Sequence, residues 1–364
     1  MKITTVDVTR YAQQGAGNPE ILVVDVVTDD GIEGRGYQMM HGIPGQYAAA
    51  LLTERLAPCV IGADPWLTSL LWERMYQALP RRGGDGLARG SIAAIDTALW
   101  DIKARQAGVP LSSLFGGRRE QVPTYANCAH HLPPDKLAEK ALEYVAKGHR
   151  ALKIRGSATY VTLAEASARV QAVREAVGAG IRLMVDVNGT WDVDTAIQQL
   201  KAWERYDVYW LEEPVPPHDI PGYARVRARA GRTYIVGGEQ HAGLTEFRAL
   251  IDANAVDILQ PNAAVTGGIT DWLRIHALAT ERGIPLSPWN LQAVHIQMAV
   301  GLPNVQWIEY FMPDNPLLAF KSRLFSGPVL EEETREDGVY LKAPDGPGLG
   351  LTLDAAFAAQ HRVD

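Results

Sequence analysis

The sequence has few of the features that mark secreted or membrane proteins. Only two of its 364 residues are cysteines, Cys59 and Cys128, and two thiols so far apart in sequence indicate buried apolar side chains instead of a disulfide framework. The N-terminal stretch lacks the apolar core of a signal peptide, and no run approaches the ~18 apolar residues of a membrane span. We therefore expect a cytoplasmic protein that has no membrane partner.

Basic residues are also in short supply. Lysine and arginine together number 35, against 42 aspartates and glutamates, so the formal net charge is -7 at pH 7. Surfaces that bind nucleic acid carry clusters of lysine and arginine. The composition therefore argues against nucleic acid as a partner.

The first 121 residues have the pattern of a separate α+β domain. Alternating apolar and polar residues predict strands on both sides of Asp29-Asp30-Gly31, and Asp-Gly is typical of tight hairpin turns. The clearest helix is expected over 91–108, where apolar residues recur every three or four positions. Strands followed by helices are typical of a segregated α+β domain.

From about residue 122 the pattern changes to alternating strand and helix. Helices are expected between apolar strands, which we predict at 123–128, 150–155, 182–187, 207–211, 234–237, 256–260, 284–287 and 306–309. Repeated βα units form parallel sheets, and this number of units predicts a closed barrel, which takes about 250 residues. We expect the barrel to cover 122–335 and the tail, 336–364, to return to the N-terminal domain.

Three predicted strands each end at an acidic residue. Asp186, Glu212 and Glu239 are separated by 26 and 27 residues, about one strand plus one helix, so their side chains should meet at one rim of the barrel. Carboxylates brought together repel one another unless a cation neutralises them. Oxygen ligands without histidine or cysteine favour Mg²⁺, with Mn²⁺ as the alternative.

Several segments together carry a family resemblance that covers nearly the whole chain. They are VVTDDGIEGRG, SIAAIDTALWDIKARQAGVPLSSLFGG, LKIR, MVDVNG, WLEEP, GGEQ, DILQPNAAVTGGI and DGPGLGL. With these segments the chain resembles the enolase superfamily, and within it the branch of mandelate racemase and the acid-sugar dehydratases. The resemblance implies a (β/α)7β-type TIM barrel with an α+β N-terminal capping domain, and Mg²⁺ chemistry with a Lys or His base.

The resemblance also assigns residues. The family's metal ligands match Asp186, Glu212 and Glu239, while its K-x-K motif matches Lys153-Ile154-Arg155. Residues 153 and 155 alternate to the same side of a strand, so both should face the barrel mouth. Glu309 matches an acid that donates to the substrate carboxylate, for which it would have to be protonated; its alternative is an ion pair at the rim.

The chain departs from this family at the usual catalytic dyad. Asn262 stands at the aspartate position and Trp289 at the histidine position, and neither is a base. Arg155 is also a poor base, so it is expected to bind a carboxylate or form a structural ion pair. Lys153 is left as the predicted base, with its pKa lowered by Arg155, the metal and burial; the family more often uses this lysine to hold the substrate carboxylate.

Further polar side chains are expected around the substrate. Asn188 follows Asp186 on the same face, His241 could replace the missing acid, and His295 is expected to pack within a helix. The other predicted substrate contacts are Tyr160, His41, Asn262 and Trp289, with Arg81 or Arg82 from the capping domain. For His41 and Tyr160 the alternative is an ordinary solvated loop residue.

The expected activity is Mg²⁺-dependent removal of the proton α to a carboxylate, followed by loss of a β-hydroxyl. That makes the chain a hydro-lyase that dehydrates a sugar acid, a small-molecule carboxylate, to a 3-deoxy-2-keto acid. A racemase, epimerase or cycloisomerase is the alternative, disfavoured because the histidine usual on the second face is absent. A barrel that only binds metal and carboxylate is the alternative from another class. Homo-oligomers are also expected.

Overall fold

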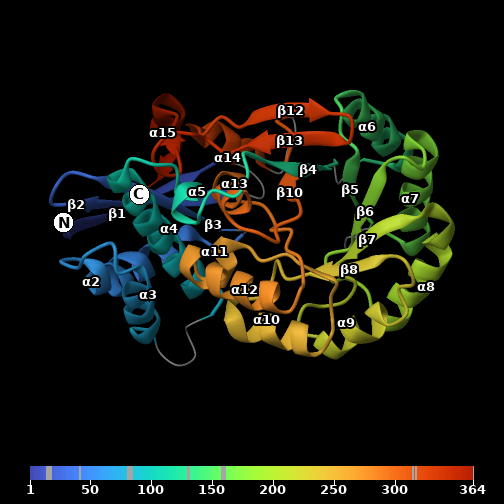
Figure 1. Ribbon diagram of the computed structural model, residues 1–364, viewed down its shortest axis with the longest axis horizontal. Helices are drawn as coiled ribbons and strands as arrows, with labels where there is room; N and C mark the ends of the chain where they lie inside the picture. Colours follow the sequence, from blue (N-terminus) through green and yellow to red (C-terminus); the bar gives the residue numbers. More distant parts are fainter. Residues whose placement is uncertain are drawn as a thin grey trace.

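The computed structural model describes residues 1–13, 19–40, 42–79, 85–128, 132–156, 161–313, 315 and 318–363. Figure 1 shows the N-terminal strands and helices on one side and a ring of strands and helices on the other. This arrangement agrees with the expected capping domain and barrel. No helix within the described ranges is long and apolar enough to cross a membrane.

The capping domain begins with three antiparallel strands of a four-stranded sheet. They are β1 (Ile3–Ala12), β2 (Glu20–Thr28) and β3 (Glu33–Met39). The predicted hairpin turn lies between the second and third strands. The helical elements that follow are α1 (Gly45–Leu51), a π-helical turn η1 (Leu52–Leu56), α2 (Ala57–Val60), α3 (Thr68–Gln77), α4 (Leu87–Ala107) and α5 (Leu111–Leu114).

Two glycines let β3 lie directly against helix α4. A Cβ atom added to Gly36 would stand 2.0 Å from the backbone oxygen of Ala94, and one added to Gly34 would stand 2.2 Å from that of Ala98. Backbone atoms of a buried helix cannot move aside as a flexible side chain can. Close sheet-to-helix packing in the capping domain therefore depends on both glycines.

We expect Gly36→Ala to destabilise the protein by about 1–3 kcal/mol, the usual cost of overpacking a core. Urea unfolding followed by circular dichroism measures this difference. Gly180→Ala is the matched control, since a Cβ at Gly180 meets no atom within 4 Å. Equal unfolding midpoints for the two variants would show that the sheet and helix can separate at no cost.

The second half is a closed parallel barrel. Its strands are β4 (Gln121–Asn127), β5 (Ala151–Arg155), β6 (Arg182–Asp186), β7 (Val208–Glu212), β8 (Tyr234–Gly237), β9 (Ile258–Leu259) and β10 (Ile308–Tyr310). Leu286 bridges Leu259 and Val305 in place of a full seventh strand, and β10 pairs with β4 to close the ring. The predicted strand order and closure are confirmed, with the seventh strand reduced to isolated bridges.

Helices cover the outside of the barrel, and large side chains fill its interior. The helical elements are α6 (Pro134–Ala146), α7 (Leu163–Val177), α8 (Val193–Trp203), η2 (Glu204–Tyr206), α9 (Ile220–Arg227), α10 (Gly243–Asp252), α11 (Ala263–Thr266), α12 (Ile269–Glu281) and α13 (Gln292–Gly301). Inside, Tyr125, Met184 and Trp210 are fully buried and pack together. The barrel is therefore a packed core with its chemistry at one end.

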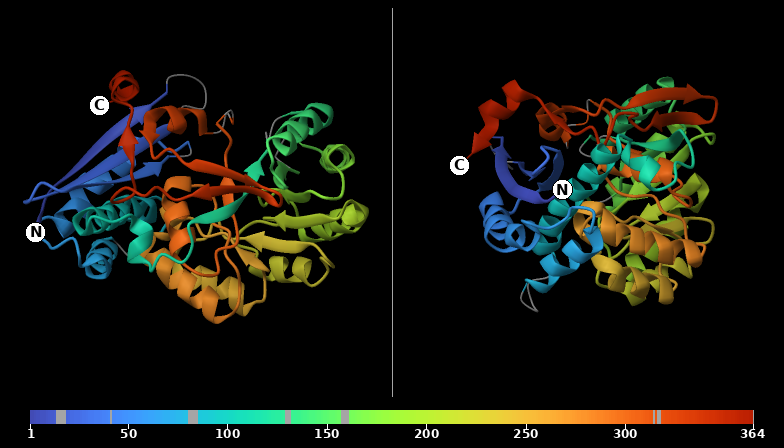
Figure 2. Two further views of the ribbon diagram at one scale, coloured as in Figure 1. Left: turned by 45° about the horizontal axis from the view of Figure 1, so that its top comes forward. Right: turned by 60° about the vertical axis from the view of Figure 1, so that its left-hand side comes forward.

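Residues 318–363, called the tail from here on, contact both halves. Its elements are α14 (Ala319–Leu324), β11 (Phe325–Gly327), β12 (Glu331–Arg335), β13 (Gly338–Lys342), β14 (Thr352–Leu353), α15 (Ala355–His361) and β15 (Arg362–Val363). The β13 strand pairs with β4 of the barrel, while β15 pairs with β1 of the cap. Both views of Figure 2 show the C-terminal helix beside the N-terminal strands.

Polar contacts fix the cap on the barrel. The buried carboxylate of Asp96, in α4, accepts hydrogen bonds from the Thr270 backbone at 2.9 Å and hydroxyl at 2.6 Å, in α12. Trp72 Nε1 donates to the Gly267 backbone oxygen at 2.6 Å. These contacts join helices α3 and α4 of the cap to the barrel. Because β3 packs on α4, they also keep β3 and the loop after it over the carboxyl ends of the barrel strands.

Candidate active site

A cavity of about 320 Å³ lies between the cap and the carboxyl ends of the barrel strands. Both domains contribute to its wall. The barrel and tail supply Asn127, Lys153, Arg155, Asp186, Trp289, Asn290, Phe311 and Leu318, and the cap supplies Pro19, Glu20, Met39, Met40 and Gly42. Carboxyl ends of the strands are where barrel enzymes place their active sites.

Lys153 is the central cation of this cavity. It is 0% exposed, and its Nζ lies 2.6 Å from Glu212 Oε1, 2.8 Å from Glu309 Oε1 and 3.8 Å from Asp186 Oδ2. Arg155 Nη1 lies 3.2 Å from the same Asp186 oxygen. Residues 153 and 155 therefore face the same side, as the alternation along a strand predicts.

The expected lowering of the Lys153 pKa is wrong for this structure. Burial lowers it, but the negative charges of Glu212, Glu309 and Asp186 outweigh burial and raise the pKa of Lys153 well above its usual range. Too many carboxylates surround one ammonium for Arg155 to reverse the balance. Lys153 is consequently a hydrogen-bonding cation in this arrangement.

Asp186, Glu212 and Glu239 occupy neighbouring positions at the barrel rim. Asp186 and Glu212 are paired residues at the ends of adjacent strands, and Glu239 follows β8 by two positions. Across the described ranges, however, no group of three or more His, Cys, Asp or Glu side chains is arranged closely enough to hold one ion. Lys153 and Arg155 instead draw Glu212 and Asp186 toward themselves, so joint metal binding by the three acids stays a prediction.

The donor set still fits a hard cation. Glu212 Oε2 and Glu239 Oε2 are buried and, among the described residues, have no hydrogen-bond partner. Burial is the main reason that the pKa of Glu212 is raised to about 8 and that of Glu239 well above its usual range. Buried unpaired carboxylate oxygens are costly, and a divalent ion between them would remove that cost.

Asn188 holds two neighbouring acids, Asp186 and Glu213, in place. Glu213 Oε2 accepts from Asn188 Nδ2 at 3.3 Å and from Gln240 Nε2 at 2.9 Å. The Asn188 backbone donates to Asp186 Oδ1 at 2.9 Å. Asn188 thus orients Asp186 and Glu213, and its contact with substrate or metal-bound water stays a prediction.

Glu309 forms the ion pair that was the alternative to its acid role. Besides its contact with Lys153, Oε1 accepts from Asn127 Nδ2 at 2.7 Å, and Oε2 accepts from the Asn290 backbone at 3.3 Å. Both oxygens therefore act as acceptors. Asn127, at the end of β4 in PTYANC, was missed in the sequence, although its position at a strand end was a usable signal.

The two residues at the dyad positions have different surroundings. Trp289 lines the cavity, and its contact with substrate stays a prediction. Asn262 caps helix α11, with Oδ1 accepting from the Ala264 backbone at 2.8 Å, and it lines a neighbouring apolar cavity that shares Met39, Met40 and Asn290 with the first. Its predicted substrate contact would have to come from that side.

The histidines are placed apart from the acids. His241 is 3% exposed and packs against the rings of Tyr223 and Phe247, away from the residues that line the cavity. His295 is buried in α13, as expected, and bonds to the backbone of Ala263 and Asn290. The predicted contacts His41 and Tyr160, and also Arg81 and Arg82, lie outside the described residues.

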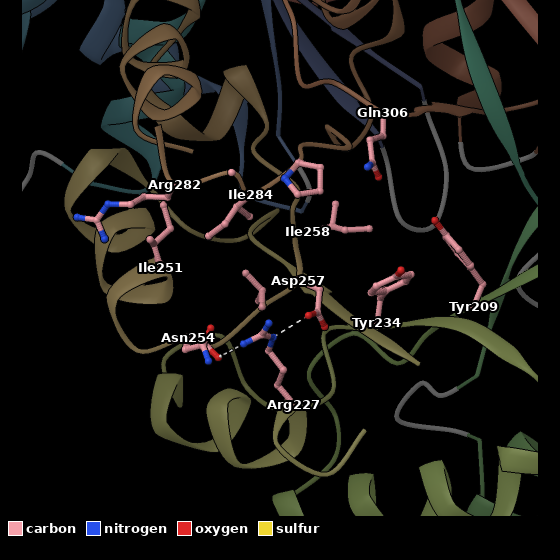
Figure 3. Close-up of a pocket in the computed structure, with 13 residues that line it drawn as sticks. Tyr209, Arg227, Tyr234, Ile251, Asn254, Asp257, Ile258, Arg282, Ile284 and Gln306 are labelled. Atoms are coloured by element: carbon pink, nitrogen blue, oxygen red, sulfur yellow. Dashed lines mark hydrogen bonds and ion pairs between the residues drawn. The ribbon is translucent and has the colours of Figure 1, made fainter. Parts of the chain in front are cut away.

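A second cavity, of about 500 Å³, lies at the opposite end of the barrel. Figure 3 shows Tyr209 and Tyr234 on one side of it and the ion pair of Arg227 with Asp257, at 2.8 Å, on another. These residues lie at or near the amino ends of β7, β8 and β9. That face of a barrel usually serves stability. The cavity at the carboxyl ends of the strands, lined by Lys153, Arg155 and Asp186, is therefore the better candidate for catalysis.

Comparison with known proteins agrees with this architecture. Residues 2–116 match the mandelate racemase / muconate lactonizing enzyme N-terminal domain, and residues 136–357 match the enolase C-terminal domain-like family. An L-talarate/galactarate dehydratase of Salmonella typhimurium is 34% identical, over 92% of this chain and 80% of its own length. A 3,6-anhydro-alpha-L-galactonate cycloisomerase of Streptomyces coelicolor is 32% identical, over 92% and 89%.

Solved structures give the same result. L-talarate dehydratase of Polaromonas sp. JS666, complexed with Mg and L-glucarate, has a TM-score of 0.88 at 32% identity, covering 100% of this chain and 98% of that one. A racemase of Streptomyces coelicolor with bound magnesium has a TM-score of 0.89 at 29% identity, covering 99% and 100%. The chain belongs to the mandelate racemase/muconate lactonizing enzyme family of the enolase superfamily.

Proposed function

We propose that this chain dehydrates a sugar acid in an Mg²⁺-dependent reaction that begins with removal of the α-proton. The observation that carries the proposal is a cavity lined by Lys153, Arg155 and Asp186. Lys153 pairs with the buried Glu212, and both Glu212 and Glu239 keep a carboxylate oxygen without a partner among the described residues. Galactarate, galactonate and gluconate dehydratases among the relatives support the same reaction class. The product would be a 3-deoxy-2-keto acid and one molecule of water.

The residues that would hold the ion are Asp186, Glu212 and Glu239. Bound Mg²⁺ supplies positive charge that stabilises the negative charge developing on the substrate carboxylate. Mn²⁺ is expected to substitute, because both ions prefer oxygen ligands. Asn188 orients Asp186, so its role in the proposal is to keep that carboxylate directed into the site.

Lys153 and Arg155 would act on the substrate directly. Arg155 presents a guanidinium at the cavity wall, where it can bind a carboxylate and add to the positive potential. Lys153 also lines the cavity, and we assign it the proton transfer, for which Mg²⁺ held by the three acids would offset the carboxylate charges that raise its pKa; holding the substrate carboxylate is its alternative role. Glu309 and Asn127 keep the Lys153 ammonium in place from the side of β10 and β4.

A racemase, epimerase or cycloisomerase is the second candidate. The observation that favours it is the apolar part of the cavity wall, where Met39, Met40, Trp289, Phe311 and Leu318 lie. Apolar walls suit a substrate with fewer hydroxyl groups than a linear sugar acid. Proton return without loss of water would then be the expected outcome.

A product screen tests these functions. The protein with 5 mM Mg²⁺ would be incubated with galactarate, L-talarate, galactonate, gluconate and arabinonate, and with aryl- and alkyl-substituted hydroxy acids, and products would be identified by NMR. A 3-deoxy-2-keto acid establishes the dehydratase, and a stereoisomer or lactone rearrangement establishes the second candidate. If no substrate is converted although Mg²⁺ binds, the protein is a binding barrel and the proposal fails.

A further inference from the structure

A half-buried lysine contacts a residue in the wall of the candidate active site. Lys321 belongs to helix α14 of the tail, and its Nζ lies 3.2 Å from Asn290 Oδ1 and 5.8 Å from the centre of the Tyr37 ring. Tail, barrel and cap therefore meet at this ammonium. Neither Lys321 nor Asn290 stands out in the sequence.

Asn290 is held in an unusual backbone conformation. Its φ is +53°, a left-handed value that non-glycine residues adopt at some cost and mainly where the surroundings enforce it. Its side-chain Oδ1 accepts from the Leu291 backbone at 2.7 Å and from Lys321, and its own backbone N–H donates to Glu309. Its backbone oxygen is bonded to His295 Nδ1 at 2.6 Å.

One group of Asn290 is left to act on a ligand. Asn290 lines both the candidate active-site cavity and the apolar cavity beside it. Within the described part of the chain, its Nδ2 donates no hydrogen bond, while Oδ1 has two donors that fix the orientation of the amide. Asn290 therefore brings an amide of fixed orientation, with an N–H donor to spare, to the cavity wall. It follows directly after Trp289, which stands where the family's histidine is missing.

We propose that Lys321 is a positioning residue, whose ammonium group fixes the Asn290 amide as a hydrogen-bond donor to the substrate. This inference rests on the proposed function, because it assigns Asn290 to substrate recognition at the same site. Lys321 acts through two contacts: it donates to Asn290 Oδ1, and its charge lies near Glu309, which accepts from the Asn290 backbone. Glu309 in turn contacts Lys153, so one connected set of side chains joins the tail to the central cation.

Among the titratable groups packed around it, Lys321 is the one whose pKa lies closest to neutral pH. Burial lowers the pKa of Lys321 to about 8, against the opposing charge of Glu309 on β10. His295 on α13 is neutral, since burial lowers its pKa to about 3, and burial raises the pKa of Tyr37 on β3. His361 of the neighbouring helix α15 faces Phe320 and Phe357.

A pH effect with a definite sign follows. Below pH 8 Lys321 is charged and holds the Asn290 amide; above pH 8 it becomes neutral and this hold weakens. We expect kcat/KM to fall on the basic side with an apparent pKa near 8. In Lys321→Arg the guanidinium keeps its charge, so this basic limb should move upward by more than one pH unit.

Kinetics of Lys321→Met and Lys321→Arg test the proposal against a merely structural role. Lys321→Met is expected to raise KM by about 10- to 100-fold, the usual effect of losing a charge-assisted hydrogen bond, to change kcat much less, and to lose the basic limb. Lys321→Arg should recover part of the KM. Lys201→Met, at an exposed lysine of α8, is the control. An unchanged KM and pH profile in Lys321→Met would overturn the proposal.

An NMR titration separates this proposal from the proposed function, because it needs no turnover. The protein labelled with ¹³C in lysine and ¹⁵N in asparagine would be titrated from pH 6 to 11, with Lys321→Arg and Asn290→Asp used to assign the signals. Titration of Lys321 near pH 8, with a parallel shift of the Asn290 side-chain N–H signals, supports the inference even if no acid is turned over. Titration above pH 10, or Asn290 signals that do not respond, would overturn it.

Discussion

Replacing Lys153 with methionine is expected to lower kcat by about 10²- to 10⁴-fold, the range usual for loss of a proton-transfer group. The ammonium is fully buried, and it is the cation closest to Glu212 and Glu309, at 2.6 and 2.8 Å. Methionine keeps the length of the side chain but leaves both carboxylates without their partner. Steady-state kinetics at saturating Mg²⁺ measure the loss, and Mg²⁺ titration calorimetry shows whether the metal still binds.

Lys153→Arg distinguishes the two roles of this residue. An arginine remains protonated at neutral pH, so it can hold a carboxylate but cannot accept the α-proton. We expect it to be as inactive as the methionine variant. Recovery of most of the turnover would assign Lys153 to substrate binding, and a Lys153→Met enzyme with near-normal kcat would remove it from catalysis altogether. Lys201→Met again serves as the surface control.

Replacing Glu239 with glutamine should weaken Mg²⁺ binding by at least about 100-fold and abolish measurable turnover. Glutamine has the same shape but lacks the negative charge that a hard cation requires. Isothermal titration calorimetry gives the affinity, and the product assay gives the activity. Full activity in Glu239→Gln would exclude this residue as a metal ligand.

The same substitution should affect stability in the opposite direction when no divalent ion is present. Glu239 is buried beside Glu213 and Asp186, and like charges in a buried cluster destabilise the folded protein. In chelator, we therefore expect Glu239→Gln to melt at a higher temperature than the wild type. With Mg²⁺ added, we expect it to melt at a lower temperature than the wild type. Asp194→Asn, whose side chain is 82% exposed, should change neither value.

The barrel could be predicted from the sequence because its signals are local. Each strand is a short apolar run followed by a helical pattern, and the acids at 186, 212 and 239 recur at the length of one βα unit. The prediction was less accurate at the seventh strand, where only Leu286 makes bridges to its neighbours. A run of apolar residues around 284–287 indicates burial, but it does not determine how many ladder hydrogen bonds form.

The electrostatics and the supporting residues could not be predicted in the same way. The number of carboxylates around Lys153 depends on Glu309, which is distant in sequence and reaches Lys153 only when β10 closes the barrel onto β4. Asn290 and Lys321 meet because the tail folds back over the loop after the seventh strand position. Such contacts are tertiary, and no spacing within the chain indicates them.

The most direct test of the account is where hydrogen enters the product in D₂O. The acid converted fastest in the product screen would be incubated in D₂O with Mg²⁺, and in parallel with a chelator, and the product analysed by NMR and mass spectrometry. We predict one solvent deuterium at C3 of the 3-deoxy-2-keto acid, loss of the substrate α-hydrogen to solvent, and no reaction in chelator. Transfer of the original α-hydrogen to C3, or conversion that continues without a divalent ion, would contradict metal-dependent proton abstraction.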